Sequence, residues 1–103
     1  MNDYYTLESK VVQWAKDRKI IPNSSPTAQL LKAVSEMGEL ADAENKSDMP
    51  AIKDAVGDVM VCLINYCHMR GITVTDCLAG AYEEIKDRRG TLLANGVFVK
   101  EAA

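Results

Sequence analysis

Two pairs of acidic residues at helical spacing are the part of this chain best suited to chemistry. Glu36 and Glu39 lie three residues apart, and Asp54 and Asp58 lie four apart. Residues at these spacings share one face of a helix, so each pair can point both carboxylates in one direction. Carboxylates from two neighbouring helices supply the hard oxygen ligands that Mg²⁺ prefers. The spacing therefore predicts a site for a divalent cation.

The second acidic pair opens an unusually apolar segment. From Ala55 to Cys67, setting aside the amphipathic Tyr66, only Asp58 and Asn65 are polar. A helix that is hydrophobic all round is usually buried, and a buried carboxylate is costly unless it is paired or holds a metal. The structural alternative is that Asp54 favours the dipole of its first turn while Asp58 makes a structural hydrogen bond.

The first acidic pair belongs to a polar stripe that also contains Gln29 and Lys32. The alternative interpretation is a solvated helix face on which Lys32 pairs with Glu36. Gly38 and Gly57 each lie next to an acidic residue inside a predicted helix. Glycine costs about 0.5–1 kcal/mol there relative to alanine, so the two glycines predict a close approach of the helices at the acidic site.

A third group, Tyr82, Lys86 and Arg89, is spaced four and three residues apart. It can be the dipole-compensating end of a helix. Beside a carboxylate–metal site, the same bases together with Arg88 can hold phosphate oxygens, for which arginine provides bidentate contacts.

Capping residues divide the chain into four predicted helices. These cover residues 6–18, 26–45, 48–70 and 73–89, with Ser25-Pro26 starting the second, Gly71 ending the third and Thr73 capping the fourth. Asn95-Gly96 predicts a turn, followed by a short strand or extended arm over 97–99. Helices joined by short loops favour an all-α bundle. Its expected core includes Trp14 and the apolar face of the second helix, which comprises Leu30, Ala33, Val34, Met37, Leu40 and Ala41.

Composition narrows the classes of partner. At 103 residues the chain predicts a single domain over 1–103 with a modest core, so the apolar third helix favours coverage by a second subunit. A net charge of -3 argues against the nucleic-acid backbone as a partner. The cysteines, Cys62, Cys67 and Cys77, are expected to be small core residues in a reducing compartment. With no signal peptide and no apolar run long enough for a membrane span, we expect a cytoplasmic protein.

Several of these segments resemble the MazG-like all-α nucleoside triphosphate pyrophosphohydrolase superfamily, which includes all-α dUTPase and dCTPase relatives. The similar segments begin at Gln29, Glu36, Lys53, Ile85 and Asn95. The resemblance implies a four-helix bundle-like fold completed as a homodimer or a dimer of dimers, with a short extended C-terminal arm. It also implies hydrolysis of a nucleoside triphosphate, preferably a deoxynucleotide, to the monophosphate and pyrophosphate. The implied cofactor is Mg²⁺, with Mn²⁺ as an alternative.

The family pattern is E-E-x-x-E followed by E-x-x-D, and the resemblance implies roles for the residues that match it. Glu36, Glu39 and Asp58 become catalytic metal ligands, and Asp54 becomes a substitute ligand. Beside such a metal site, we assign substrate binding to Gln29, Lys32, Asn65, Tyr82, Lys86, Arg88 and Arg89. Ser35 and Ala55 replace two glutamates of the pattern. These departures keep two alternatives open: a catalytically weak or inactive module that binds nucleotides or proteins, and a purely structural helical dimer.

Overall fold

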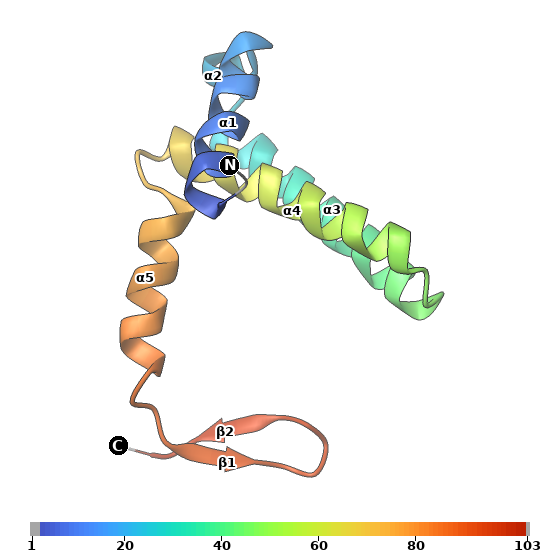
Figure 1. Ribbon diagram of the computed structural model, residues 1–103, viewed down its shortest axis with the longest axis vertical. Coiled ribbons are helices and arrows are strands. Elements are labelled where there is room, and N and C mark those ends of the chain that lie inside the picture. Colours follow the sequence, from blue (N-terminus) through green and yellow to red (C-terminus); the bar gives the residue numbers. More distant parts are fainter. Residues whose placement is uncertain (1–2, 103) are drawn as a thin grey trace.

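The computed structural model describes residues 3–102 and is mainly helical (Figure 1). This confirms the all-α class and adds α2, a short helix that the sequence did not predict. The elements in chain order are α1 (Tyr4–Asp17), α2 (Ile20–Asn23), α3 (Pro26–Asn45), α4 (Met49–Met69), α5 (Val74–Ile85), β1 (Gly90–Leu92) and β2 (Phe98–Lys100).

Helices α3, α4 and α5 begin at capping residues, as the sequence predicts. Side-chain oxygens of Ser25, Asp48 and Thr73 accept hydrogen bonds from backbone N–H groups three residues later, at 3.0, 3.1 and 3.0 Å. Each bond satisfies a donor that a helix start otherwise leaves without a partner. Gly71 has φ of 75°, the left-handed conformation expected of a helix stop.

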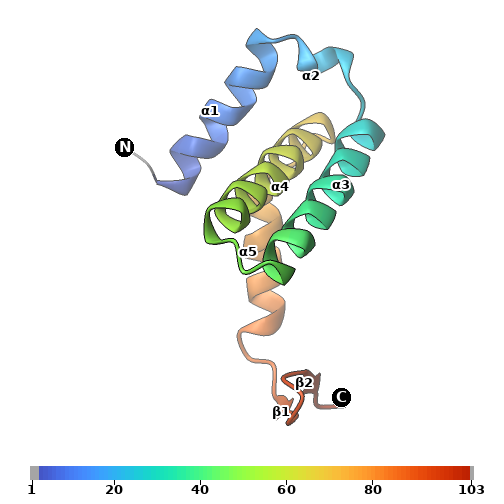
Figure 2. The same cartoon turned by 90° about the vertical axis from the view of Figure 1, so that its right-hand side faces the viewer.

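An antiparallel hairpin of α3 and α4 forms the centre of the molecule (Figure 2). A three-residue connection, 46–48, turns the chain between the two helices. Helix α1 packs against α4, and α2 lies near the junction of α1 with α4. Among residues 3–102 the apolar core is small and comprises Ala15, Ala33, Ala43, Ala55, Cys62, Ile64 and Cys67.

Helix α3 is rotated relative to the expectation that its whole apolar face is buried. Ala33 is buried and Leu40 is half-buried. Leu30, Val34 and Met37, however, expose 43%, 63% and 51% of their surface. The apolar face is wide, and α4 covers only the edge that adjoins the polar stripe. The prediction that this face lies in the core is therefore wrong for most of its members.

Two further core predictions also differ from the structure. Trp14 is 42% exposed and stacks under the guanidinium of Arg18, whose Cζ lies 4.7 Å from the ring centroid. Cys62 and Cys67 are buried as expected, whereas Cys77 is exposed. Both exposed residues lie on helices that other elements cover only in part.

Helix α5 extends away from the rest of the chain (Figure 1). It packs against α4, its first residues hydrogen-bond to Glu8 of α1, and none of its residues is buried. It ends at Ile85, four residues before the predicted end at Arg89. The reason is that the Arg89 carbonyl accepts a hydrogen bond from Glu101 N at 2.7 Å, so strand-like pairing already begins there.

The C-terminal segment forms a two-stranded antiparallel hairpin with Gly90 opposite Lys100 and Leu92 opposite Phe98. The predicted Asn95-Gly96 turn is confirmed: Gly96 has φ of 86°, and Asn95 Oδ1 accepts a hydrogen bond from Val97 N at 3.0 Å. We call residues 74–102, which comprise α5 and this hairpin, the arm.

Candidate functional site

The seam between α3 and α4 brings the acidic residues Glu36, Glu39 and Asp58 close together. Glu36 is only 7% exposed, although it lies on a polar stripe. Its Oε1 lies 3.3 Å from Lys32 Nζ, so the expected pair is present, with the lysine largely in solvent. The alternative interpretation of a solvated helix face therefore fails at Glu36, because the rotation of α3 directs this residue toward α4.

The proximity of these carboxylates raises the pKa of two of them. A hydrogen-bonding interaction with Glu36, followed by the negative charge of Glu36, raises the pKa of Glu39. Partial loss of hydration raises the pKa of Asp58, and the charges of Asp54 and Glu36 raise it further. Both shifts have the sign expected where negative charge collects without enough positive charge to balance it.

One oxygen of this cluster is buried without a partner. Glu36 Oε2 accepts no hydrogen bond within the part of the chain that the structure describes. Leaving such a group unsatisfied costs about 1–3 kcal/mol, and more when it is charged. An oxygen ligand set with one unpartnered, buried carboxylate oxygen fits a hard divalent cation such as Mg²⁺ or Mn²⁺.

The carboxylates are neighbours, but they do not form a finished coordination shell. Among residues 3–102, no three Asp, Glu, His or Cys side chains converge as a group able to hold one ion. The site that these residues can build requires side-chain movement toward the cation.

The two departures from the family pattern differ in their surroundings. Ala55 is 4% exposed and packs in the core beside the seam, while Ser35 is exposed. Asp54, also exposed, lies one turn before Asp58 and acts on it through its charge. A carboxylate at position 55 would face the seam more directly than Asp54 does.

The two glycines next to the acidic residues do not mark a close helix approach. A Cβ atom built on Gly38 or Gly57 meets nothing within 4 Å. Both positions therefore face open space in this chain, and the prediction drawn from them is wrong.

Asn65 and Gln29, which we expected to contact the substrate, have different environments. Asn65 is 2% exposed, and its Oδ1 has no hydrogen-bond partner among the described residues. Gln29 is half-buried and donates from Nε2 to Ser24 Oγ at 3.0 Å. Asn65 is thus a second buried acceptor without a partner on the helix that carries Asp58.

The bases predicted to hold phosphate lie on the arm, away from the seam. Lys86 Nζ pairs with Glu83 at 2.8 Å, and Arg89 Nε lies 3.6 Å from Glu101. Arg88 and Tyr82 are exposed. Neither α5 nor the hairpin packs against α3 (Figure 1), so a single chain brings Lys32 to the carboxylates but leaves the bases of the arm apart from them.

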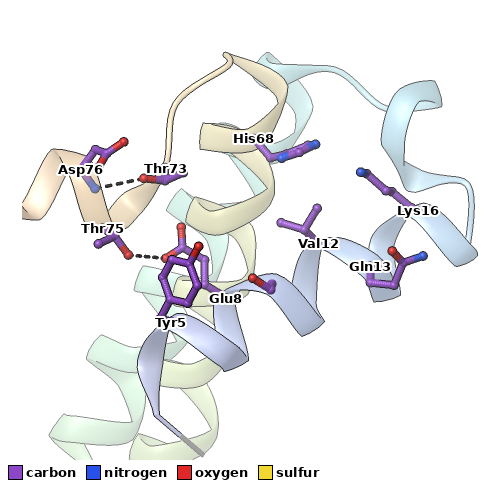
Figure 3. Close-up of a pocket in the computed structure, with 10 residues that line it drawn as sticks. Tyr5, Glu8, Val12, Gln13, Lys16, His68, Thr73, Thr75 and Asp76 are labelled. Carbon is purple, nitrogen blue, oxygen red and sulfur yellow. Dashed lines mark hydrogen bonds between the residues drawn. The ribbon is translucent and has the colours of Figure 1, made fainter.

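Sequence reasoning missed a cavity of about 460 Å³ between α1, the end of α4 and the start of α5 (Figure 3). At its base, the buried Glu8 accepts hydrogen bonds from Val74 N at 3.2 Å and from Thr75 Oγ1 at 2.6 Å. Glu8 therefore holds the beginning of α5 against α1. The only local signal for it is an acidic residue seven positions before the buried Ala15, which places it on the buried face of α1.

The length and hydropathy of the helices also bear on membrane insertion. Within residues 3–102, none of them is both long enough and apolar enough to cross a bilayer.

Comparison with known proteins finds similarity in the part of the chain that contains both acidic pairs. Residues 24–92 match the family model of the MazG nucleotide pyrophosphohydrolase domain. A protein of Haemophilus phage HP1 (strain HP1c1), described as an uncharacterized 18.2 kDa protein in the rep-hol intergenic region, is 36% identical over 64 residues. That alignment spans 62% of this chain and 39% of the phage protein, so the chain matches only about two fifths of its relative.

A solved structure shares the fold over nearly the whole chain. It is the cyanophage S-2L MazG-like pyrophosphohydrolase, described as bound to dGDP and three catalytic Mn²⁺ ions per active site. The TM-score is 0.71 at 18% sequence identity, covering 99% of this chain and 100% of the cyanophage chain. The MazG-like all-α fold is thereby confirmed. Since the family model matches more than half of the chain, including both acidic pairs, the protein belongs to the MazG family of nucleotide pyrophosphohydrolases.

Proposed function

We propose that this protein hydrolyses a nucleoside triphosphate, preferably a deoxynucleotide, to the nucleoside monophosphate and pyrophosphate in the presence of Mg²⁺. We further propose that residues 1–103 act as one MazG-like domain. The observation that carries the proposal is the unpartnered, buried Oε2 of Glu36 beside Glu39 and Asp58. Family membership supports the reaction class. The dGDP and Mn²⁺ of the cyanophage relative support a nucleotide ligand and a divalent cation.

In this proposal the chain's own residues bind and orient the reactants. Glu36, Glu39 and Asp58 hold the cation, and Asp54 adds negative charge from one turn away. When bound, the cation neutralises phosphate charge and lowers the pKa of water. Lys32, whose side chain is 63% exposed, can turn from Glu36 toward a phosphate oxygen. In this proposal, Gln29 of α3 and Asn65 of α4 contact the sugar, the base or an ordered water.

Product analysis tests the reaction directly. The purified protein is incubated with each common NTP and dNTP, with and without Mg²⁺, and the products are separated by anion exchange. We expect monophosphate and pyrophosphate in equal amounts from one or two substrates, and only when Mg²⁺ is present. Diphosphate and inorganic phosphate as the products would contradict the proposed bond cleavage.

A second candidate, a module that binds nucleotides without turnover, is favoured by Ser35 and Ala55, which remove two carboxylates of the family pattern. The incomplete convergence of the acidic side chains among residues 3–102 points the same way. Calorimetric titration with a nonhydrolysable dNTP and Mg²⁺ distinguishes the two. Binding without turnover of the natural nucleotide would favour the module, and absence of any binding would leave a structural dimer.

A further inference from the structure

The joint between α4 and α5 brings two cysteines together. Cys67 lies in the last turn of α4, and Cys77 lies near the start of α5. Cys67 is 8% exposed, whereas Cys77 is open to solvent. The Cys77 thiol is nevertheless within hydrogen-bonding reach of the Cys67 thiol. Two thiols from different helices therefore meet at the point where the arm begins.

Backbone hydrogen bonds keep the two cysteines near each other. Ile72 N donates to the Cys67 carbonyl at 2.9 Å, and Cys77 N donates to the Thr73 carbonyl at 3.1 Å. Because Ile72 and Thr73 are adjacent in the chain, these two bonds connect the backbones of the cysteines by a short path. The proximity of the thiols thus follows from the local fold of residues 67–77 as well as from the side-chain rotamers.

Helix α1 holds the same joint from a third side. The buried Glu8 accepts hydrogen bonds from Val74 N and Thr75 Oγ1, so its carboxylate fixes the first turn of α5 (Figure 3). Hydrogen bonds to an ionised carboxylate are roughly twice as strong as neutral ones. His68 and Asp76, the neighbours of the two cysteines in the chain, line the cavity above Glu8. Glu8 therefore restrains Cys77 close to Cys67.

The two thiols differ in reactivity. Burial raises the pKa of the Cys67 thiol, and the charge and hydrogen bond of Cys77, followed by the charge of Glu8, raise it further. Cys67 therefore stays protonated and shielded from reagents in solution. Cys77 is the thiol that a reagent reaches first. An accessible thiol beside a second, resolving thiol is typical of redox-sensing pairs.

Helical geometry separates this pair from the other features of α4 and α5. Cys62 lies five residues before Cys67 on α4, which places it about 140° away around the helix axis. The apolar face of α5 comprises Leu78, Tyr82 and Ile85, which are 65%, 58% and 49% exposed. Cys77 lies about 100° from Leu78 around the axis. A bond between Cys67 and Cys77 therefore needs neither Cys62 nor the apolar face.

We propose that Cys67 and Cys77 form a reversible disulfide that fixes the start of the arm on α4, so that the freedom of the arm depends on oxidation. The inference is independent of the proposed function. In the reducing compartment expected from the sequence, a disulfide of this kind is transient and reports an oxidising change.

The proposed oxidant is a low-molecular-weight disulfide of the glutathione class. The Cys77 thiolate attacks one sulfur of the oxidant, the S–S bond of the oxidant breaks, and one thiolate leaves. The Cys67 thiol then gives up its proton and attacks the Cys77 sulfur, which releases the second thiolate. The two protein thiols lose two electrons and two protons, and the oxidant is reduced to two thiols.

Peptide mapping after oxidation tests the pairing. The reduced full-length protein is incubated with oxidised glutathione, its remaining thiols are blocked, and it is digested with trypsin without reduction. Because trypsin cleaves after Lys53, Arg70 and Lys86, we expect peptides 54–70 and 71–86 to be joined by a disulfide. Cys62→Ala should give the same joined pair, which assigns the bond to Cys67.

Two variants show whether the bond closes within one chain. Cys67→Ala should stop at a mixed disulfide between Cys77 and glutathione, and Cys77→Ser should take up neither. On a non-reducing gel the oxidised wild-type protein should run as a single chain. A stable mixed disulfide on the wild-type protein, or a bond between the Cys77 thiols of two chains, would overturn the proposal.

The restraint by Glu8 is tested by titration in glutathione buffers of graded redox ratio. The ratio at half oxidation gives the effective concentration of the two thiols, which should fall at least about 3-fold in Glu8→Gln because the joint is loosened. The matched control is Glu44→Gln, an exposed acid at the end of α3, which should titrate like the wild type. Equal values for Glu8→Gln and the wild type would remove Glu8 from the switch.

Amide hydrogen exchange tests whether the bond restrains the arm. A cross-link opposes local opening of the helix that it anchors, so exchange at residues 78–81 should slow at least about 3-fold on oxidation. Amides in α3 should exchange equally in both states, and Cys77→Ser should not respond to the oxidant. Equal exchange at residues 78–81 in the reduced and oxidised wild-type protein would overturn the role of the bond in the arm.

Discussion

The α3–α4 seam and the arm differ in which of their side chains are buried and which are exposed. In the seam, α3 buries Glu36 against α4 and leaves Leu30, Val34 and Met37 largely exposed. In the arm, both the apolar face of α5 and the bases that follow it are exposed. A helix normally buries its apolar face. A buried acid beside exposed leucines is the pattern expected when the acid belongs to a site.

The largest effect should come from removing a charge in the seam. Asp58→Asn keeps the size of the side chain but loses a metal ligand. We expect turnover to fall by at least about 100-fold, beyond the 10–100-fold typical for the loss of an outer-shell partner. Steady-state pyrophosphate release measures this, with far-ultraviolet circular dichroism as the control for helix content. Turnover close to that of the wild-type protein would remove Asp58 from the site.

A charge introduced on the arm should instead act by preventing two copies of the chain from associating. Leu78→Asp places a charge in the centre of the α5 apolar face, which is solvent-exposed in the single chain. The chain should therefore stay folded but become monomeric, because we expect two copies to associate through this face. Light scattering after size exclusion reports the mass. The control is Glu83→Gln on the polar face of the same helix, which should remain dimeric.

Glu36→Gln separates stability from function in the seam. The neutral amide removes the charge from the buried Oε2, which has no hydrogen-bond partner among the described residues. The ion pair with Lys32 is also lost, but the lysine is largely exposed, so that pair contributes little. Without metal, we expect the free energy of unfolding to rise by about 1 kcal/mol and the melting temperature by about 4–8 °C. Added Mg²⁺ should stabilise the wild-type protein and not the variant. Thermal unfolding at fixed protein concentration tests both statements, and a variant less stable than the metal-free wild type would contradict them.

The smallest effects should come from two glycines that face open space, one in each region. Gly57→Ala in α4 and Gly80→Ala in α5 add a methyl group that meets nothing within 4 Å. Each should raise the free energy of unfolding by about 0.5–1 kcal/mol. In a Leu78→Asp monomer, Gly80→Ala should have a smaller effect than Gly57→Ala, because α5 then lacks its cover. Urea unfolding of six proteins makes the comparison: the wild type, Leu78→Asp, and each glycine variant in both backgrounds.

Local signals in the sequence predicted the helices well and their packing less well. Ser25, Asp48, Thr73 and Gly71 act through bonds or dihedral angles within a few residues, and the structure confirms each. The end of α5 was misplaced because Arg89 pairs with Glu101, a contact that helical spacing does not contain.

In the candidate site, too, local signals were predicted well and packing was not. The acidic stripe could be found from spacing, yet its burial at Glu36 depends on how α3 rotates against α4. The wide apolar face of α3 allows more than one rotation, so Leu30 and Met37 were assigned to a core that they do not enter. Glu8 was missed because its partners, Val74 and Thr75, lie 66 and 67 residues away in the chain.

Titration with Mn²⁺, followed by the loss of the free-ion signal in electron paramagnetic resonance, tests the central claim that the seam is a divalent cation site. The wild-type protein should bind Mn²⁺, Mg²⁺ should displace it, and Asp58→Asn should bind it at least about 10-fold more weakly. A Glu83→Gln control should bind like the wild type. Absence of binding by the wild-type protein, or equal binding by Asp58→Asn, would contradict the account.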